Sequence, residues 1–123
     1  MSASDINFFF LMTNQIKLYH WQTRTFSRHK ATDTALSTLS EHIDKYVEVY
    51  IGKYGRPKLD ARTNSTQLVN MSEVSIVKFL RRCITYITRD LTKGLKNTDT
   101  DLFNLRDEML AELNQLLYLF TLH

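Results

Sequence analysis

Turn-forming residues and cysteine are scarce in this chain. Its 123 residues include one proline, three glycines and one cysteine. An all-β domain needs turn residues at roughly every tenth position, so this composition favours a few long helices. The single Cys83 excludes an internal disulfide framework and a cysteine-rich zinc site. Its neighbours in LRRCITYI indicate a core position in a helix.

Long apolar runs and blocks of like charge are also missing. No stretch approaches the length of a transmembrane helix, and MSASDINFFFLM has no basic residues before its apolar run, unlike a signal peptide. We therefore expect an intracellular protein with no membrane partner. The formal net charge is +3, with 16 Lys and Arg interspersed among 13 Asp and Glu. This pattern is typical of a mixed solvated surface. It is compatible with nucleic-acid binding but provides no basic tail.

The length is that of one domain, which we expect to span residues 1–123. Apolar residues recur at helical spacing in four segments. The expected buried stripes are Phe9, Met12, Ile16 and Tyr19; Leu36, Leu39, Ile43, Tyr46, Val47, Tyr50 and Tyr54; Val77, Leu80, Ile84, Ile87 and Leu91; and Leu102, Leu105, Met109, Leu113, Leu116 and Phe120.

Capping residues predict where these helices begin and end. Ser4 or Asp5 is expected to cap the first helix. Gly55 is expected to end the second. Gly94 and Asn97 are expected to end the third, and TDTD at 98–101 provides the N-cap of the fourth.

Residues 56–71 lack helical periodicity and are too many for a tight helical hairpin. About sixteen extended residues can span a helix of about 37 Å, so the helices on either side should run parallel. The connection between the third and fourth helices is short. The sequence therefore predicts an all-α four-helix bundle with one long crossover between helices 2 and 3, which is the ferritin-like connection.

Four residues are candidate metal ligands: His20, His29, Asp44 and Glu48. Asp44 and Glu48 lie one helical turn apart, a spacing that a solvated acidic face also produces. Fifteen residues of helix separate His29 from Asp44 by about 22 Å, so these two side chains of one chain cannot share an ion. His20 and His29 flank a turn and can lie close together. If all four bind metal, two chains must supply them, as in a two-fold dimer. Mixed nitrogen and oxygen ligands suit iron, manganese or zinc, and iron where an oxidant is handled.

The order His20-Trp21, His29-x14-Asp44-x3-Glu48 and then Gly-Arg-Pro resembles the Dps branch of ferritin-like proteins, the miniferritins. The pattern is also similar to short Dps-like proteins of phages and large DNA viruses. The resemblance implies that iron binds between subunits, with ligands at His20, His29, Asp44 and Glu48. It further implies a homo-oligomer, with a closed cage built on two-fold dimers. His42 remains open as an alternative fourth ligand.

Three functional hypotheses follow. The first is a ferroxidase that sequesters Fe²⁺ at inter-subunit sites and protects against oxidative damage. The second is a non-catalytic homo-oligomer, structural or associated with nucleic acid, with a vestigial metal site; a viral source would place it in the virion. The third is a helical adaptor that uses Tyr46, Tyr50 and Tyr54 as its interface. Trp21 is expected to pack at a helix end rather than to donate electrons.

Overall fold

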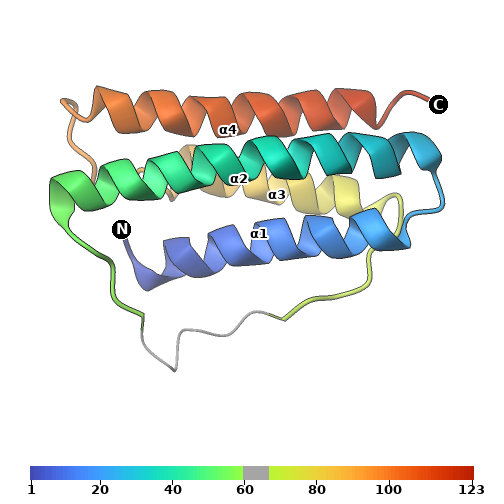
Figure 1. The fold of residues 1–123 in the computed structure, drawn as a ribbon, viewed down its shortest axis with the longest axis horizontal. Helices are drawn as coiled ribbons and strands as arrows, with labels where there is room; N and C mark the ends of the chain where they lie inside the picture. The colour runs from blue at the N-terminus through green and yellow to red at the C-terminus, as the bar shows by residue number, and fades with distance from the viewer. Residues whose placement is uncertain (60–66) are drawn as a thin grey trace.

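The computed structural model describes residues 1–59 and 67–123, and in these residues the chain forms helices and no strand. Figure 1 shows the four helices in their order along the chain. They are α1 (Ala3–Gln22), α2 (Phe26–Tyr54), α3 (Ser75–Arg89) and α4 (Thr100–Leu119). The all-α prediction is confirmed. Residues 60–66 of the predicted crossover lie outside the described residues.

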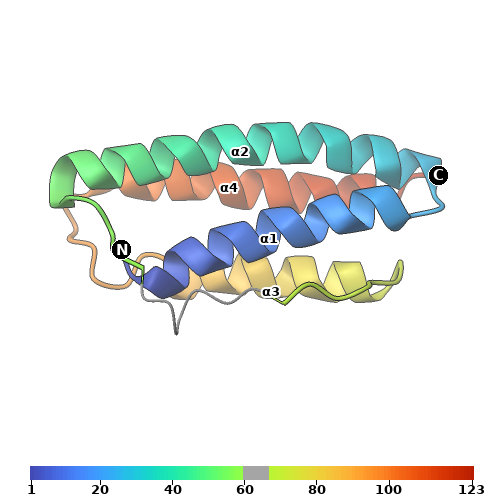
Figure 2. The ribbon, with the colours of Figure 1, turned by 60° about the horizontal axis from the view of Figure 1, so that its bottom comes forward.

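The helices form a four-membered bundle in which each helix has two neighbours. α2 packs against α1 and α4, while α3 packs against α4 and α1. In the described residues α1 and α4 are therefore diagonal to each other, as are α2 and α3. The colour order in Figures 1 and 2 shows that α2 and α3 run in the same direction, whereas α1 and α4 run in the opposite one. This is the parallel arrangement that the length of the connection predicts.

Two of the expected helix ends are wrong by a few residues. Ser2, rather than Ser4 or Asp5, caps α1, because its side chain accepts from the Asp5 N–H while the Asp5 carboxylate accepts from the Ser2 N–H, a reciprocal capping box. α3 ends at Arg89, earlier than Gly94. There the N–H of Leu91 bonds the carbonyl of Tyr86, five residues earlier, in a turn wider than that of an α-helix, and Leu91 is buried. α2 ends before Gly55, as expected, and Gly55 has a φ of 91°, a conformation that favours glycine.

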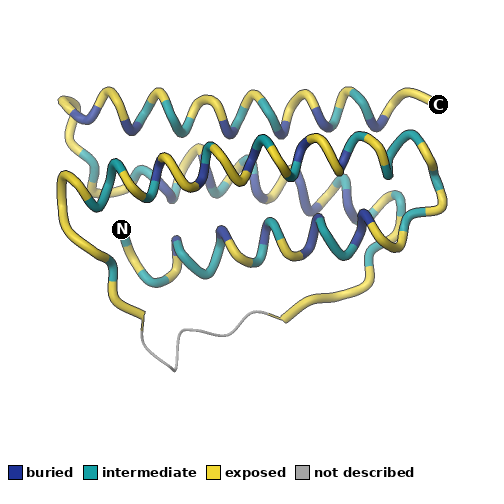
Figure 3. The backbone as a smooth tube through the Cα atoms, viewed as in Figure 1, coloured by how far each residue is buried: buried dark blue, intermediate teal, exposed yellow. Residues whose placement is uncertain are grey.

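The predicted stripes supply most of the core, and Figure 3 shows buried positions recurring along every helix. α3 is rotated relative to the prediction: Val77 and Ile84 are only half-buried. The apolar stripe of α3 is wide, so the sequence does not determine which residues lie at the centre of its buried face. The packing of α3 against α1 and α4 determines them. The buried residues of α3 are Ile76, Phe79, Leu80, Cys83 and Ile87. Burial raises the pKa of the Cys83 thiol to about 12, as expected for a core cysteine.

A polar cluster joins α1 and α2 to the residue before the start of α3 and the residue after the end of α4, at the end of the bundle where α1 turns into α2. The Tyr19 hydroxyl donates to the Glu73 carboxylate at 2.5 Å, and Thr23 donates to its other oxygen at 2.8 Å. Arg28 pairs with Glu73 at 3.1 Å and also donates to the backbone carbonyl of Phe120 at 3.3 Å. Partial burial acts to raise the pKa of Glu73, but the hydrogen bonds from Tyr19 and Thr23 and the charge of Arg28 outweigh it and lower the pKa.

A second polar cluster joins α2 to the start of α4 at the opposite end. The buried carboxylate of Asp99 accepts from Lys53 at 2.7 Å, from the Tyr54 hydroxyl at 2.5 Å and from the Lys96 N–H at 2.8 Å. These three donors hold the pKa of Asp99 at about 2. The expected tyrosine stripe therefore divides between roles: Tyr46 is in the core, whereas Tyr54 is exposed and binds Asp99.

No helix in the described part of the chain is both long enough and apolar enough to cross a membrane.

Removing one hydroxyl tests the Glu73 cluster. Tyr19→Phe keeps the buried ring but removes a donor to a carboxylate, and we expect it to lower the free energy of unfolding by about 1–2 kcal/mol. Urea denaturation measures the difference. Tyr118→Phe, at an exposed tyrosine on α4, serves as the control and should leave the stability unchanged. Equal effects of the two substitutions would contradict a stabilising role for the cluster.

Candidate metal centre

The two candidate histidines lie against each other. His20 is in the last turn of α1 and His29 near the start of α2, and the short turn at residues 23–25 brings the two helices together. The rings stack with centroids 4.0 Å apart and planes inclined by 12°. The sequence-based expectation that these two residues are close at one end of the bundle is confirmed.

Hydrogen bonds assign the same tautomer to both histidines. Nδ1 of His29 lies 2.9 Å from the carbonyl oxygen of His20, which only accepts, so this nitrogen carries the proton. Nδ1 of His20 lies 2.8 Å from the Thr32 hydroxyl. That hydroxyl gives its single proton to the carbonyl of Arg28, at 2.8 Å, and therefore accepts from His20. With Nδ1 engaged, Nε2 is the nitrogen of each ring that can bind a metal when the imidazole is neutral.

The stacked rings are not yet arranged around one ion. A metal ion binds an imidazole nitrogen in the plane of the ring, and two rings that are stacked nearly parallel, with centroids 4.0 Å apart, do not direct their nitrogens at one point. One ring must therefore tilt before both lone pairs can meet a single ion. His29 is the half-buried ring, whereas His20 is 6% exposed and held by Thr32. Each ring is held by one hydrogen bond at Nδ1, and His29 is the more exposed of the two.

The environment also keeps His20 neutral. Burial and the neighbouring His29 lower its pKa below the ordinary histidine value, with a smaller contribution of the same sign from Lys17; Asp33 acts in the opposite direction. A neutral imidazole is the form that binds metal, so the site has no proton to displace from His20 near neutral pH.

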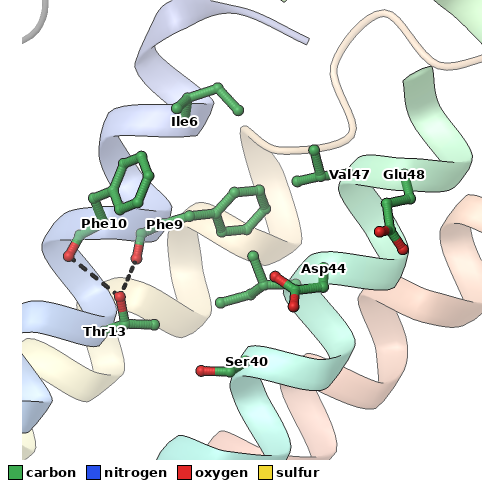
Figure 4. Close-up of a pocket in the computed structure, with 9 residues that line it drawn as sticks. Ile6, Phe9, Phe10, Thr13, Ser40, Asp44, Val47 and Glu48 are labelled. Carbon is green, nitrogen blue, oxygen red and sulfur yellow. Dashed lines mark hydrogen bonds between the residues drawn. The ribbon is translucent and has the colours of Figure 1, made fainter. Parts of the chain in front are cut away.

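The candidate carboxylates lie elsewhere, in the C-terminal half of α2. Asp44 and Glu48 are exposed, and Figure 4 shows them at the edge of a groove between α1 and α2. The groove has a volume of about 320 Å³, and its apolar lining includes Phe9 and Phe10. Its remaining lining residues are Ile6, Thr13, Ser40, Ile43 and Val47. The structure thus brings the carboxylates together with apolar side chains rather than with the histidines.

Each chain therefore holds two incomplete halves of the predicted site. In residues 1–59 and 67–123, no three His, Cys, Asp or Glu side chains gather closely enough to hold a metal ion. His20 and His29 are stacked on each other. Asp44 and Glu48 lie farther along α2, beside the groove.

The structure also places two other residues that the sequence analysis singled out. His42 is two positions from Asp44, about 200° around the helix, and it interacts with Glu112 of α4, so it does not face the groove. Trp21 does not pack: its side chain is 68% exposed, with Lys17 Nζ 5.6 Å from the ring centroid. It follows His20 by one residue, and the rotation that buries His20 turns Trp21 outward.

Sequence reasoning missed Thr32, the residue that sets the tautomer of His20. Thr32 is fully buried and lies three residues after His29 on the same face of α2. A polar residue at helical spacing after a candidate ligand is a usable signal. The pattern does not show, however, that its hydroxyl would reach across to α1.

Comparisons with known proteins add a family and a phage relative. A family model described as "Family of unknown function (DUF5856)" matches residues 20–120. A protein of Enterobacteria phage T4, the "Uncharacterized 14.6 kDa protein in mobD-ri intergenic region", is 46% identical over 37 residues. That alignment covers 30% of this chain and 29% of the phage protein. No solved structure matches this chain significantly.

Acidification tests the environment of His20. Because its folded pKa lies below the unfolded value, the stability that depends on neutral His20 is fully present above about pH 6.5 and is lost as the pH falls toward the folded pKa. This one group changes the free energy of unfolding by at most about 1.4 kcal/mol per pH unit. Urea denaturation between about pH 7.5 and 5 measures the slope. His20→Gln, which does not titrate, should flatten it, and an unchanged slope would contradict the assignment.

Proposed function

This chain belongs to the DUF5856 family, and we propose that it is a Dps-like iron-binding protein that oxidises and sequesters Fe²⁺ at sites shared between subunits. The observation that carries the proposal is the histidine pair: two stacked imidazoles, each with Nδ1 engaged in a hydrogen bond, which leaves Nε2 as the nitrogen that could bind a metal. A ring nitrogen held by an oxygen acceptor is the usual arrangement behind a metal-binding histidine, and it supports the proposal.

The separation of the two half-sites supports a shared site. One chain offers two nitrogen donors at His20 and His29 and two oxygen donors at Asp44 and Glu48, and the described residues contain no complete set. A two-fold dimer that brings the histidine end of one chain to the groove of another would complete two equivalent sites. The groove supports such an interface, because an exposed Phe10 and apolar neighbours lie beside the carboxylates.

The chemistry follows from the donor set. Neutral imidazoles bind Fe²⁺ without a charge penalty, and the two carboxylates favour the Fe³⁺ product, which carries one more positive charge. Peroxide or oxygen would be the oxidant. The same donors also suit manganese or zinc. Protection against oxidative damage would follow from removing Fe²⁺ and oxidant together.

The topology supports a ferritin-like bundle. α2 and α3 run parallel and are joined by residues 55–74, whereas the α1–α2 and α3–α4 connections are short. A single long crossover of this kind is the ferritin-like connection among four-helix bundles. A homo-oligomer, with a closed cage built on two-fold dimers, is the assembly that goes with this proposal.

A second function is a non-catalytic oligomer with a vestigial site, structural or associated with nucleic acid, inside the host cell or in a virion. Two observations favour it: the rings of His20 and His29 are stacked on each other rather than splayed, and the relative comes from a phage. This function predicts the same assembly with and without metal.

Anaerobic Fe²⁺ titration followed by peroxide, read by absorbance, tests the first function. We expect saturable Fe²⁺ binding and rapid oxidation by the wild type. The double variant Asp44→Ala, Glu48→Ala should lose both, and His29→Ala should bind Fe²⁺ at least about tenfold more weakly. A matched control, Asp107→Ala with Glu108→Ala, removes the same charge from exposed positions of α4 and should bind normally.

The result also separates the two functions. Binding no stronger than that of the double variant would exclude the ferroxidase. If sedimentation then showed the same oligomer with and without Fe²⁺, the non-catalytic function would remain. A monomer at all concentrations would exclude both, because neither works without a second subunit.

A further inference from the structure

Two hollows between α1 and α2 join into one long groove. The first is the groove beside Asp44 and Glu48. The second has a volume of about 410 Å³, and Lys17 is part of its lining. Both hollows include Thr13 of α1 and Ser40 of α2, which Figure 4 shows at the first of them. The continuous groove therefore has two carboxylates at one end and a lysine at the other.

Lys17 brings a positive charge to the histidine end of this groove. It lies one helical turn before His20 and Trp21 on α1. Its charge contributes to lowering the pKa of His20, so the ammonium is close to the imidazole that the proposed function assigns to the metal. A cation that is fixed so near a metal site opposes the binding of a second cation.

No carboxylate in the described part of the chain holds the Lys17 ammonium. The recorded ion pairs do not include Lys17, although Asp33 lines the same hollow. The ammonium lies instead over the exposed ring of Trp21, with Nζ 5.6 Å from the ring centroid. An exposed cation–π contact is weak, so the ammonium can leave the ring for a stronger anionic partner at little cost.

Asp44 and Glu48 are also without an ion-pair partner within residues 1–59 and 67–123. They are exposed and one turn apart, so their charges repel each other. In the shared site of the proposed function, the histidine end of one subunit meets the groove of another. That arrangement brings Lys17 to the two carboxylates, where an ammonium and a metal ion need the same oxygen atoms.

We propose that Lys17 competes with the metal ion for Asp44 and Glu48 of the partner subunit and so sets the metal affinity of the shared site. This inference rests on the proposed function, because it concerns the same site. In the empty site the ammonium pairs with the carboxylates and helps to hold two subunits together. When a divalent ion binds, the ammonium withdraws on its flexible four-carbon stem, and the ring of Trp21 receives it.

Competition predicts that one substitution moves two measurements in opposite directions. Lys17→Gln removes the charge and keeps a good helix former. Without the repulsion from the ammonium, Zn²⁺ should bind about tenfold more tightly. Without the ion pairs, of which a two-fold dimer has two sets, metal-free subunits should associate roughly fivefold more weakly. A residue that only maintained the fold of α1 would not strengthen one property while it weakened the other.

Calorimetric titration of the full chain with Zn²⁺ alone measures the first property, and sedimentation equilibrium in the presence of a chelator measures the second. Zn²⁺ suits the same donors and is not oxidised. Lys17→Arg keeps the charge and should stay within about threefold of the wild type in Zn²⁺ affinity. Lys78→Gln removes the same charge from an exposed position of α3 and should change neither property. Equal thermal midpoints verify the fold of each variant.

The outcomes distinguish failure of this inference from failure of the proposed function. If the wild type binds Zn²⁺ and Lys17→Gln binds it no more tightly, the inference is wrong and the shared site is unaffected. If only Lys17→Gln binds Zn²⁺, the lysine occupies the site, so the inference holds while the ferroxidase is excluded. Weaker Zn²⁺ binding together with weaker association would make Lys17 a structural residue and overturn the inference. Absence of Zn²⁺ binding in both proteins would overturn the inference and the shared metal site together.

Discussion

The hydrogen bonds and the ion pair of the Glu73 carboxylate hold together the end of the bundle that carries His20 and His29. This carboxylate accepts hydrogen bonds from the hydroxyls of Tyr19 and Thr23 and forms an ion pair with Arg28. It therefore joins α1, the α1–α2 turn and α2 to the residues just before α3. Arg28 extends the cluster to the carbonyl of Phe120, the residue that follows α4. His20 and His29 are the immediate sequence neighbours of Tyr19 and Arg28. Their contact is therefore positioned by a charged cluster that crosses the whole bundle, and not only by the short turn between their helices.

The α1–α2 side of the bundle gathers groups of opposite charge that are spread along the sequence. It carries the histidine pair, the two carboxylates and an apolar groove, which together suit an interface between subunits that shares a metal ion. The same groove continues to Lys17 at its other end. The cations of α3 belong to another side of the bundle, because α2 and α3 are diagonal.

Helical periodicity and a few residues of special conformation predicted much of the fold. The stripes of α1 and α4 are buried almost as expected, and Gly55 ends α2 because glycine adopts a positive φ without strain. The errors have physical causes. Ser2 has a partner in Asp5 that makes it the better cap, and burial of Leu91 ends α3 early. Trp21 follows buried His20 and must point outward, which a pattern of apolar residues does not reveal.

By itself the sequence determined the four helices, their order and direction, and the inability of His29 and Asp44 of one chain to share an ion, because these follow from spacing and from the fixed rise of a helix. Only the tertiary structure decided the tautomers. The proton on Nδ1 of His20 depends on Thr32, a residue of another helix, and on where that hydroxyl sends its own proton. It also decided the rotation of α3, because burial of Ile76, Leu80 and Cys83 turns the cations of this helix outward. Rotation and cross-helix hydrogen bonds depend on packing partners that are distant along the chain.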